Sequence, residues 1–194
     1  MDSIKKGKDL IVGIDPGSRI LGIAMFDKKD LVASYAIRTV EMEWDKRLLE
    51  IEQVIKELIF RYGIKKAFIE NYAFGSKFGL PKSGEVGWAI RRIFHQFNIP
   101  ILLITPITAR CFLLGHLGKK SEVRLGVYKR FNKTAGEDEA DAIALGSVGQ
   151  HLFFSIPGKN KYEKNILKRI KKAHEKVKKE ISEQKKKGDK HDLS

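Results

Sequence analysis

The sequence predicts an α/β layer fold with a mixed sheet. Three apolar stretches follow one another with only short turns between them, which is the pattern of an antiparallel meander. Two more short apolar stretches come later, each after an amphipathic helical segment, which is the pattern of parallel strands joined by helices. The five strands are expected at residues 10–15, 20–26, 31–40, 65–71 and 101–104.

The two connecting helices are predicted from apolar residues that recur at helical spacing. Residues 43–62 carry such a stripe, and Gly63 is a suitable C-terminal cap. Residues 85–97 carry another, with Val86 and Ile90 on one face. Residues 72–84 between them are rich in glycine and aromatic residues and are expected to be irregular. Three more helices are expected at residues 108–117, 121–131 and 137–152.

Composition limits the classes of protein to consider. Hydrophobic residues make up 42% of the 194 residues, which is enough for a core, and one cysteine excludes an internal disulfide and a cysteine-based zinc site. The N-terminus MDSIKKGKDL lacks the apolar segment of a signal peptide, so we expect a protein that is cytoplasmic, in a bacterial cell or a virus-infected host cell, and not secreted.

The charge is strongly positive and uneven. The formal net charge is +14, which favours binding to a polyanion such as nucleic acid. Residues 159–194 hold 14 Lys and Arg against 6 Asp and Glu, and apolar residues recur there every three or four positions. We therefore expect a body at residues 1–158 and a basic, lysine-rich tail at residues 159–194, helical or disordered, that is loose beyond Gln184.

Four acids are placed where they could converge. Asp15 and Glu70 each end a predicted strand, and parallel neighbouring strands would bring both to one edge of the sheet. Asp138 and Asp141 lie three residues apart, on one face of a helix whose alanines allow close packing. Oxygen ligands of this kind suit Mg²⁺ or Mn²⁺, and a pair of such ions catalyses attack of water on phosphodiesters. Taken singly, each acid could instead be a surface residue or a helix cap.

The motifs around these acids resemble the RuvC family of Holliday junction resolvases. They are GIDPGSRILGIA, the glutamate of AFIEN, and DEADAIALG, and the resemblance extends over residues 10–152. It implies an RNase H-like fold with a mixed five-stranded sheet flanked by helices, a homodimer, and cleavage of four-way DNA junctions that depends on divalent metal. The family's catalytic and metal-binding acids correspond to Asp15, Glu70, Asp138 and Asp141.

The resemblance also suggests residues that contact DNA. In RCFLLGHLGKK, Arg110 and Lys120 match the family's basic residues near the scissile phosphate, and Lys119 is an alternative to Lys120 as the catalytic lysine. The family tends to carry an aromatic residue shortly after the strand-end glutamate. Here Tyr72 and Phe74 are available, whereas the third position after Glu70 is Ala73. The remaining candidates for DNA contact are Lys77 and Lys82.

The expected function is resolution of four-way junctions by paired symmetric nicks that leave 5′-phosphate and 3′-hydroxyl ends, with two Mg²⁺ ions per site and Mn²⁺ as a substitute. A sugar-kinase or actin-like ATPase is disfavoured because 194 residues leave no room for a second lobe. A related nuclease for other branched DNA or RNA–DNA hybrids stays open, as does a junction-binding protein without catalysis. The dimer surface is expected on residues 85–97, through Trp88, Phe94 and Phe97.

Overall fold

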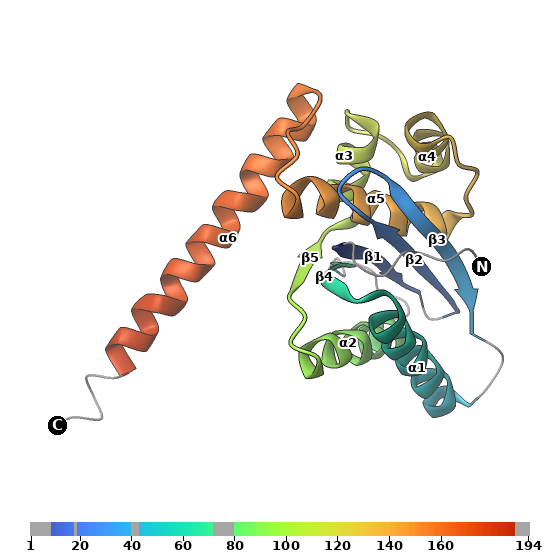
Figure 1. Ribbon diagram of the computed structural model, residues 1–194, viewed down its shortest axis with the longest axis horizontal. Helices are drawn as coiled ribbons and strands as arrows, with labels where there is room; N and C mark the ends of the chain where they lie inside the picture. Colours follow the sequence, from blue (N-terminus) through green and yellow to red (C-terminus); the bar gives the residue numbers. More distant parts are fainter. Residues whose placement is uncertain (1–8, 18, 40–42, 72–79, 189–194) are drawn as a thin grey trace.

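The computed structural model describes residues 9–17, 19–39, 43–71 and 80–188. Its centre is one mixed sheet of five strands in the order β3-β2-β1-β4-β5 (Figure 1). β1 pairs antiparallel with β2 and parallel with β4, β2 pairs antiparallel with β3, and β4 pairs parallel with β5. The strands are β1 (Leu10–Pro16), β2 (Ile20–Phe26), β3 (Leu31–Arg38), β4 (Ile64–Glu70) and β5 (Ile101–Ile104). The predicted α/β class and mixed five-stranded sheet are confirmed.

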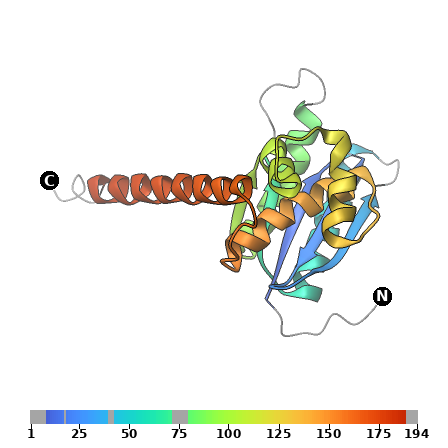
Figure 2. The ribbon, with the colours of Figure 1, turned by 90° about the horizontal axis from the view of Figure 1, so that it is seen from above.

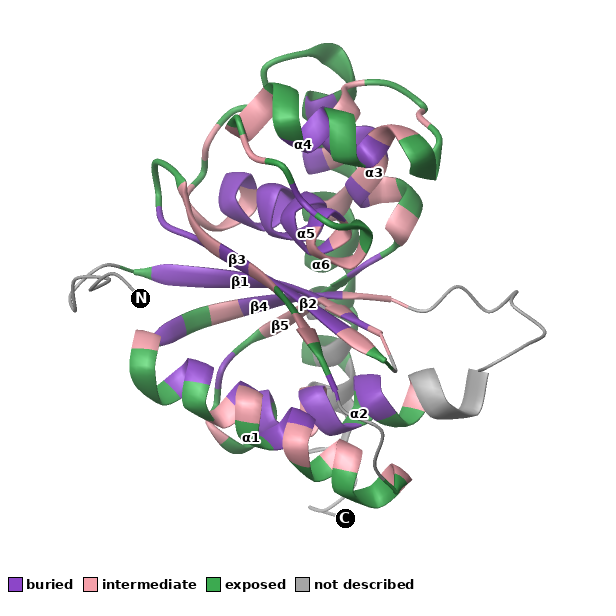
Figure 3. Cartoon of the chain, turned by 90° about the vertical axis from the view of Figure 1, so that its right-hand side faces the viewer, coloured by how far each residue is buried: buried purple, intermediate pink, exposed green. Residues whose placement is uncertain are grey.

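Helices cover both faces of this sheet, so the protein has three layers (Figure 3). α1 (Trp44–Tyr62) and α2 (Leu80–Gln96) lie on one face. The other face carries α3 (Pro106–Leu114), the short 3₁₀ helix η1 (Lys120–Glu122), α4 (Val123–Phe131) and α5 (Glu137–Phe153). Each face has its own apolar cluster, with Ile55 and Phe94 fully buried in the first and Phe68 and Phe112 in the second.

Small residues bring α5 unusually close to the central strands. A Cβ on Gly13 would lie 2.4 Å from the carbonyl oxygen of Ala142, and a Cβ on Gly22 would lie 2.1 Å from that of Asp138. Real Cβ atoms do not approach a backbone this closely, so only glycine fits at both positions. The glycines of β1 and β2 therefore fix the height at which the first turns of α5 cross the sheet.

Some predicted boundaries were wrong. α2 begins at Leu80, so the predicted irregular stretch 72–84 is helical over its last part; residues 72–79 lie outside the described chain. α3 ends at Leu114 instead of residue 117, because Gly115 adopts a left-handed conformation (φ 76°) and caps the helix. β3 ends at Arg38, two residues earlier than predicted.

The basic tail forms one long helix, α6 (Lys161–Gly188), that projects from the body (Figure 2). Of the two alternatives expected for the tail, the structure has the helix, and the chain is still helical past Gln184, contrary to the expectation of a loose end there. Only the first turns pack on the body: Leu167 is 7% exposed, whereas Val177 is 51% exposed. Among the described residues, no helix is long and apolar enough to cross a membrane.

Candidate active site

Asp15 and Glu70 lie at the same edge of the sheet, as their strand positions predict. In the parallel pairing of β1 with β4, Ile14 is opposite Ile69, so the two acids follow as the next residues of neighbouring strands. Both side chains are only partly exposed. This placement rests on the pairing of β1 and β4 at the centre of the sheet.

Asp138 reaches this edge because α5 begins directly above it. Asp15 pairs with Gly22 in the β1–β2 ladder, and the Asp138 carbonyl lies over that glycine. A Cβ on Gly17, in the turn after β1, would lie 3.7 Å from Oδ1 of Asp138, so the Asp138 carboxylate lies next to this turn. Asp141 follows one helical turn later on the same side of α5.

The carboxyl groups interact strongly with one another. Burial raises the pKa of Asp15 to about 8, and the negative charges of Glu70, Asp141 and Asp138 add to this effect. Burial also raises the pKa of Glu70 to about 7, with a further contribution from Asp141. The pKa of Asp141 is raised as well, again chiefly by burial. Without a cation, this cluster holds its negative charge at a free-energy cost, and this cost is what a bound cation removes.

Two basic side chains face the cluster. Nζ of Lys120 lies 3.1 Å from Oε1 of Glu137 and 3.7 Å from Oδ2 of Asp141. Burial lowers the pKa of Lys120, but the hydrogen bond with Glu137 and the charge of Asp141 outweigh it, so the net shift is upward. Lys120 therefore stays positively charged beside the acids.

Arg110 projects from α3 toward the same acids. Its charge lowers the pKa of Glu70 and of Asp141, which opposes the effect of burial on both. Its Nε is buried and has no hydrogen-bond partner among the described residues. A guanidinium beside these acids suits a scissile phosphate, because such groups bind phosphate through planar paired hydrogen bonds.

Other sequence candidates are placed differently. Lys119 is exposed, and its backbone N–H donates to Glu122 at 2.6 Å, whereas Lys120 is the lysine that contacts the acids. Tyr72, Phe74 and Lys77 lie outside the described residues. Lys82 belongs to the first turn of α2, and its side chain lies outside the described part.

Two acids beside the expected ones were missed by the sequence analysis. Glu137 holds Lys120 in place, and nothing in the sequence signals this pairing across 17 positions. Glu139 points away from the other acids: it accepts a hydrogen bond from Oγ of Ser34 at 2.7 Å and lies 3.2 Å from Nζ of Lys133. The acidic run at the start of α5 therefore divides between two sides of the helix.

The donor set fits a hard divalent cation by its chemistry. The four acids offer carboxylate oxygens without thiolate or imidazole, which favours Mg²⁺ or Mn²⁺ over zinc. Among the described side chains, no three His, Cys, Asp or Glu residues already stand close enough together to hold a metal ion. The acids are thus neighbours that interact through their charges, and their side chains would have to rearrange to bind one ion together.

Comparison with known proteins identifies the family. The family model described as crossover junction endodeoxyribonuclease RuvC matches residues 11–146, a span that includes all four acids. The chain belongs to the RuvC family. The resemblance and the enzyme class predicted from the sequence are thereby confirmed: the chain belongs to a family of hydrolytic DNA endonucleases, which depend on metal.

Individual relatives agree with this assignment. The RuvC of Francisella tularensis subsp. novicida is 30% identical over 170 residues, which cover 84% of this chain and 99% of that protein. The RuvC of Carboxydothermus hydrogenoformans is 28% identical over 148 residues, which cover 72% of this chain and 94% of that protein. The structure of Thermus thermophilus RuvC in complex with Holliday junction substrate matches with a TM-score of 0.65 at 21% identity, over 76% of this chain and 95% of that one. The RNase H-like class of the RuvC fold is thus confirmed here.

Proposed function

We propose that this RuvC-family chain resolves four-way DNA junctions by paired, symmetric nicks that leave 5′-phosphate and 3′-hydroxyl ends. The observation that carries the proposal is the gathering of Asp15, Glu70, Asp138 and Asp141 at one sheet edge, with their charges coupled. A junction-binding protein without catalysis would gain nothing from this cluster, since uncompensated carboxylates repel DNA phosphates.

The four acids would hold two Mg²⁺ ions, with Mn²⁺ as a substitute. Bound ions would supply an activated water and a counter-charge for the leaving 3′ oxygen. Asp15 and Glu70 hold their oxygens on rigid strand ends, and Asp138 and Asp141 offer theirs from the adjoining helix. The upward pKa shifts of Asp15 and Glu70 support the assignment, because such a cluster is stable in its ionised form only beside cations.

Lys120 and Arg110 would act on the scissile phosphate. Lys120 is held by Glu137 and Asp141. Its charge is therefore already in place near the acids, and no free energy is spent on reorienting it when substrate binds. Arg110 adds a second positive charge near the same acids. Lys119, Tyr72, Phe74, Lys77 and Lys82 are proposed to contact DNA on the strength of the sequence alone.

The dimer is proposed to form through α2, with a corrected set of residues. Trp88 is 59% exposed and lies against the guanidinium of Arg92, so it is available to a second copy. Phe94 is fully buried in the core and cannot serve, contrary to the expectation from the sequence. Phe97 is partly buried and packs edge-to-face against Phe60 of α1, which is itself 70% exposed. The aromatic surface thus spans α1 and α2.

The remaining expectations also stay proposals. We propose that residues 1–158 form the nuclease domain and that residues 159–194 form its tail, although the first turns of α6 pack on that domain. We propose a cytoplasmic protein, in a bacterial cell or a virus-infected host cell, because junctions of this kind arise on replicating and recombining DNA.

A junction extruded from supercoiled DNA tests the proposal. Both nicks made within one binding event convert the circle directly to a linear product, whereas uncoupled nicks accumulate a relaxed circle first. We expect direct linearisation in Mg²⁺. Accumulation of nicked circles, together with a monomer by light scattering, would contradict the symmetric resolvase and favour a general nuclease for branched DNA.

A further inference from the structure

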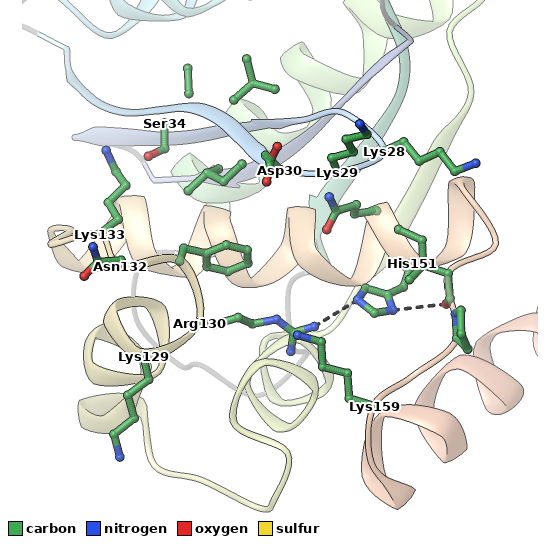
Figure 4. Close-up of a pocket in the computed structure, with 17 residues that line it drawn as sticks. Lys28, Lys29, Asp30, Ser34, Lys129, Arg130, Asn132, Lys133, His151 and Lys159 are labelled. Atoms are coloured by element: carbon green, nitrogen blue, oxygen red, sulfur yellow. Dashed lines mark hydrogen bonds between the residues drawn. The ribbon is translucent and has the colours of Figure 1, made fainter.

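A second charged site lies on the other flank of α5. It is a cavity of about 680 Å³ between the β2–β3 turn, the C-terminal end of α4 and the segment that joins α5 to α6 (Figure 4). Six basic residues from these elements line it, and we call it the basic groove. They are Lys28, Lys29, Lys129, Arg130, Lys133 and Lys159.

The floor of the basic groove is fixed. Arg130 lies over the rings of Phe112 and Phe131, at 5.3 and 5.9 Å from their centroids. Its guanidinium pairs with the buried Glu163 at 2.9 Å and lies 3.0 Å from Nε2 of His151. These contacts join α4, α5 and the start of α6, so the lysines around the floor sit on elements that are held in place relative to one another.

Three acids near the basic groove already have partners. Asp27 accepts the backbone N–H groups of Lys29 and Asp30, both at 2.8 Å, and so closes the β2–β3 turn. Glu163 pairs with Arg130, and Glu139 with Lys133. Among the described residues that line the groove, Asp30 is the one acid. An excess of positive charge remains on four exposed lysines that have no carboxylate within 4 Å among the described residues: Lys28, Lys29, Lys129 and Lys159.

The distribution of these charges favours an extended anion over a small one. A site for a small phosphate needs convergent buried donors, but the buried guanidinium of Arg130 is already engaged by Glu163 and His151. The available cations lie on the rim and come from three separate elements. Mobile rim lysines spaced along a groove match the repeating phosphates of a nucleic-acid backbone.

The basic groove starts at the first turn of α5, the helix that also carries Asp138 and Asp141. Lys133 at one end contacts Glu139, which lies between Asp138 and Asp141 in α5, and His151 marks the other end. At about 1.5 Å rise per residue, the segment of α5 from Glu139 to His151 is about 18 Å long. Duplex DNA rises about 3.4 Å per base pair along each strand, so this length corresponds to about five base pairs.

We infer that the basic groove binds the phosphate backbone of the duplex arm that leaves the cleavage site, within about five base pairs of the crossover. This inference rests on the proposed function, because the arm belongs to the junction. The groove would orient that arm along α5 while the carboxylates act at the crossover, and it would add affinity without reading sequence.

Paired charge-removing variants test this assignment. The test variant is Lys29→Gln with Lys129→Gln, and the control, Lys46→Gln with Lys65→Gln, removes the same charge from exposed positions in α1 and β4. Junction binding is measured by fluorescence anisotropy in EDTA over a range of salt. The test variant should lower the log–log salt slope by about 2 and weaken binding at least about tenfold, since each phosphate contact releases about 0.9 counterions. The control should change the slope by less than about 0.5.

Neutral methylphosphonate linkages in one arm locate the contact. With the wild-type chain, neutralising phosphates within about five base pairs of the crossover should weaken binding, and the test variant should be insensitive to the same change. Equal loss in test and control variants, or equal sensitivity of the test variant and the wild type, would overturn the inference. Competition by inorganic phosphate at constant ionic strength, in the wild type alone, would show a small-anion site and would overturn it too.

Cleavage separates this inference from the proposed function. At saturating protein in Mg²⁺, the control variant should cleave junctions at the wild-type rate, because its lysines lie outside both the groove and the carboxylate site. The test variant should still cleave in a reaction that requires Mg²⁺, because none of the four acids is changed. A wild-type chain that binds junctions with the expected salt slope but does not cleave them would refute the nuclease proposal and leave the groove supported.

Discussion

Replacing Gly22 by alanine should disable the site without touching an acid. The new Cβ would lie 2.1 Å from the Asp138 carbonyl oxygen and 2.8 Å from its carbon, both of them backbone atoms that cannot rotate away. Relief to ordinary contact requires the start of α5 to move by about 1 Å. A displacement of this size at a reacting centre costs about 10² in rate, and overpacking at a buried position costs about 1–3 kcal/mol of stability.

The assay is cleavage of a labelled four-way junction in Mg²⁺, with thermal unfolding of the same samples. Gly84→Ala is the matched control, because nothing lies within 4 Å of a Cβ at that helical position. The control should cleave normally and gain about 0.5–1 kcal/mol of stability from the better helix former. A Gly22→Ala chain that is folded at the assay temperature and cleaves at the wild-type rate would refute the reasoning, since the close approach of α5 would then not determine the geometry of the site.

Three further predictions concern charge and assembly. In EDTA, Asp15→Asn should unfold at a higher temperature than the wild type at pH 8 but not at pH 4. A carboxyl group whose pKa rises from 3.8 to about 8 on folding destabilises the folded state as the pH increases between those values. Thermal unfolding is followed by circular dichroism, and an equal pH dependence in both proteins would contradict this prediction. Residues 174–194 carry 7 Lys against 5 Asp and Glu. Removing them should preserve folding and cleavage and lower the log–log salt slope of junction binding by at most about 2. Loss of the folded state would show that the fold requires the projecting part of α6. Trp88→Glu should convert a dimer into a monomer at micromolar concentration by light scattering, and a persistent dimer would place the interface elsewhere.

The sequence was informative wherever a local pattern determines the structure. Asp15 and Glu70 could be located because each terminates an apolar run, and such runs become central strands in this fold. The spacing of Asp138 and Asp141 within a small-residue helix indicated both the helix and its close packing. These features depend on residues near one another in the chain. The order of the motifs, which resembles that of the RuvC family, then predicted how the strands and the helix are arranged relative to one another.

The early start of α2 could not be foreseen from propensity. Its first turns contain Pro81, Gly84 and Gly87, all of which disfavour a helix interior, although proline is tolerated in a first turn. Packing of Val86 and Ile90 into the core stabilises the helix that propensity disfavours. The sequence therefore predicted the apolar face of α2 but placed its start five residues too late.

Contacts between segments that are distant in the sequence could not be predicted either. The Lys120–Glu137 pair and the Arg130–Glu163 pair each join different helices, and no spacing rule predicts them. The same is true of the basic groove, which collects lysines from three segments that are separate in the sequence. Net charge predicted a polyanion partner, but the fold was needed to locate the second surface that could bind one.

The most direct test of the central claim is cleavage by the Asp15→Asn and Glu70→Gln variants. A labelled four-way junction, a linear duplex and an RNA–DNA hybrid are incubated with each protein while Mg²⁺ is varied, and binding is measured in parallel in EDTA. The wild type should cleave the junction but neither the linear duplex nor the hybrid, and only when Mg²⁺ is present. Both variants should lose at least about 10² in rate while binding the junction as well as the wild type or more tightly, since less negative charge faces the phosphates. Normal cleavage of the junction by either variant in Mg²⁺ would contradict the assignment of the site, and preferential cleavage of the hybrid by the wild type would contradict the resolvase.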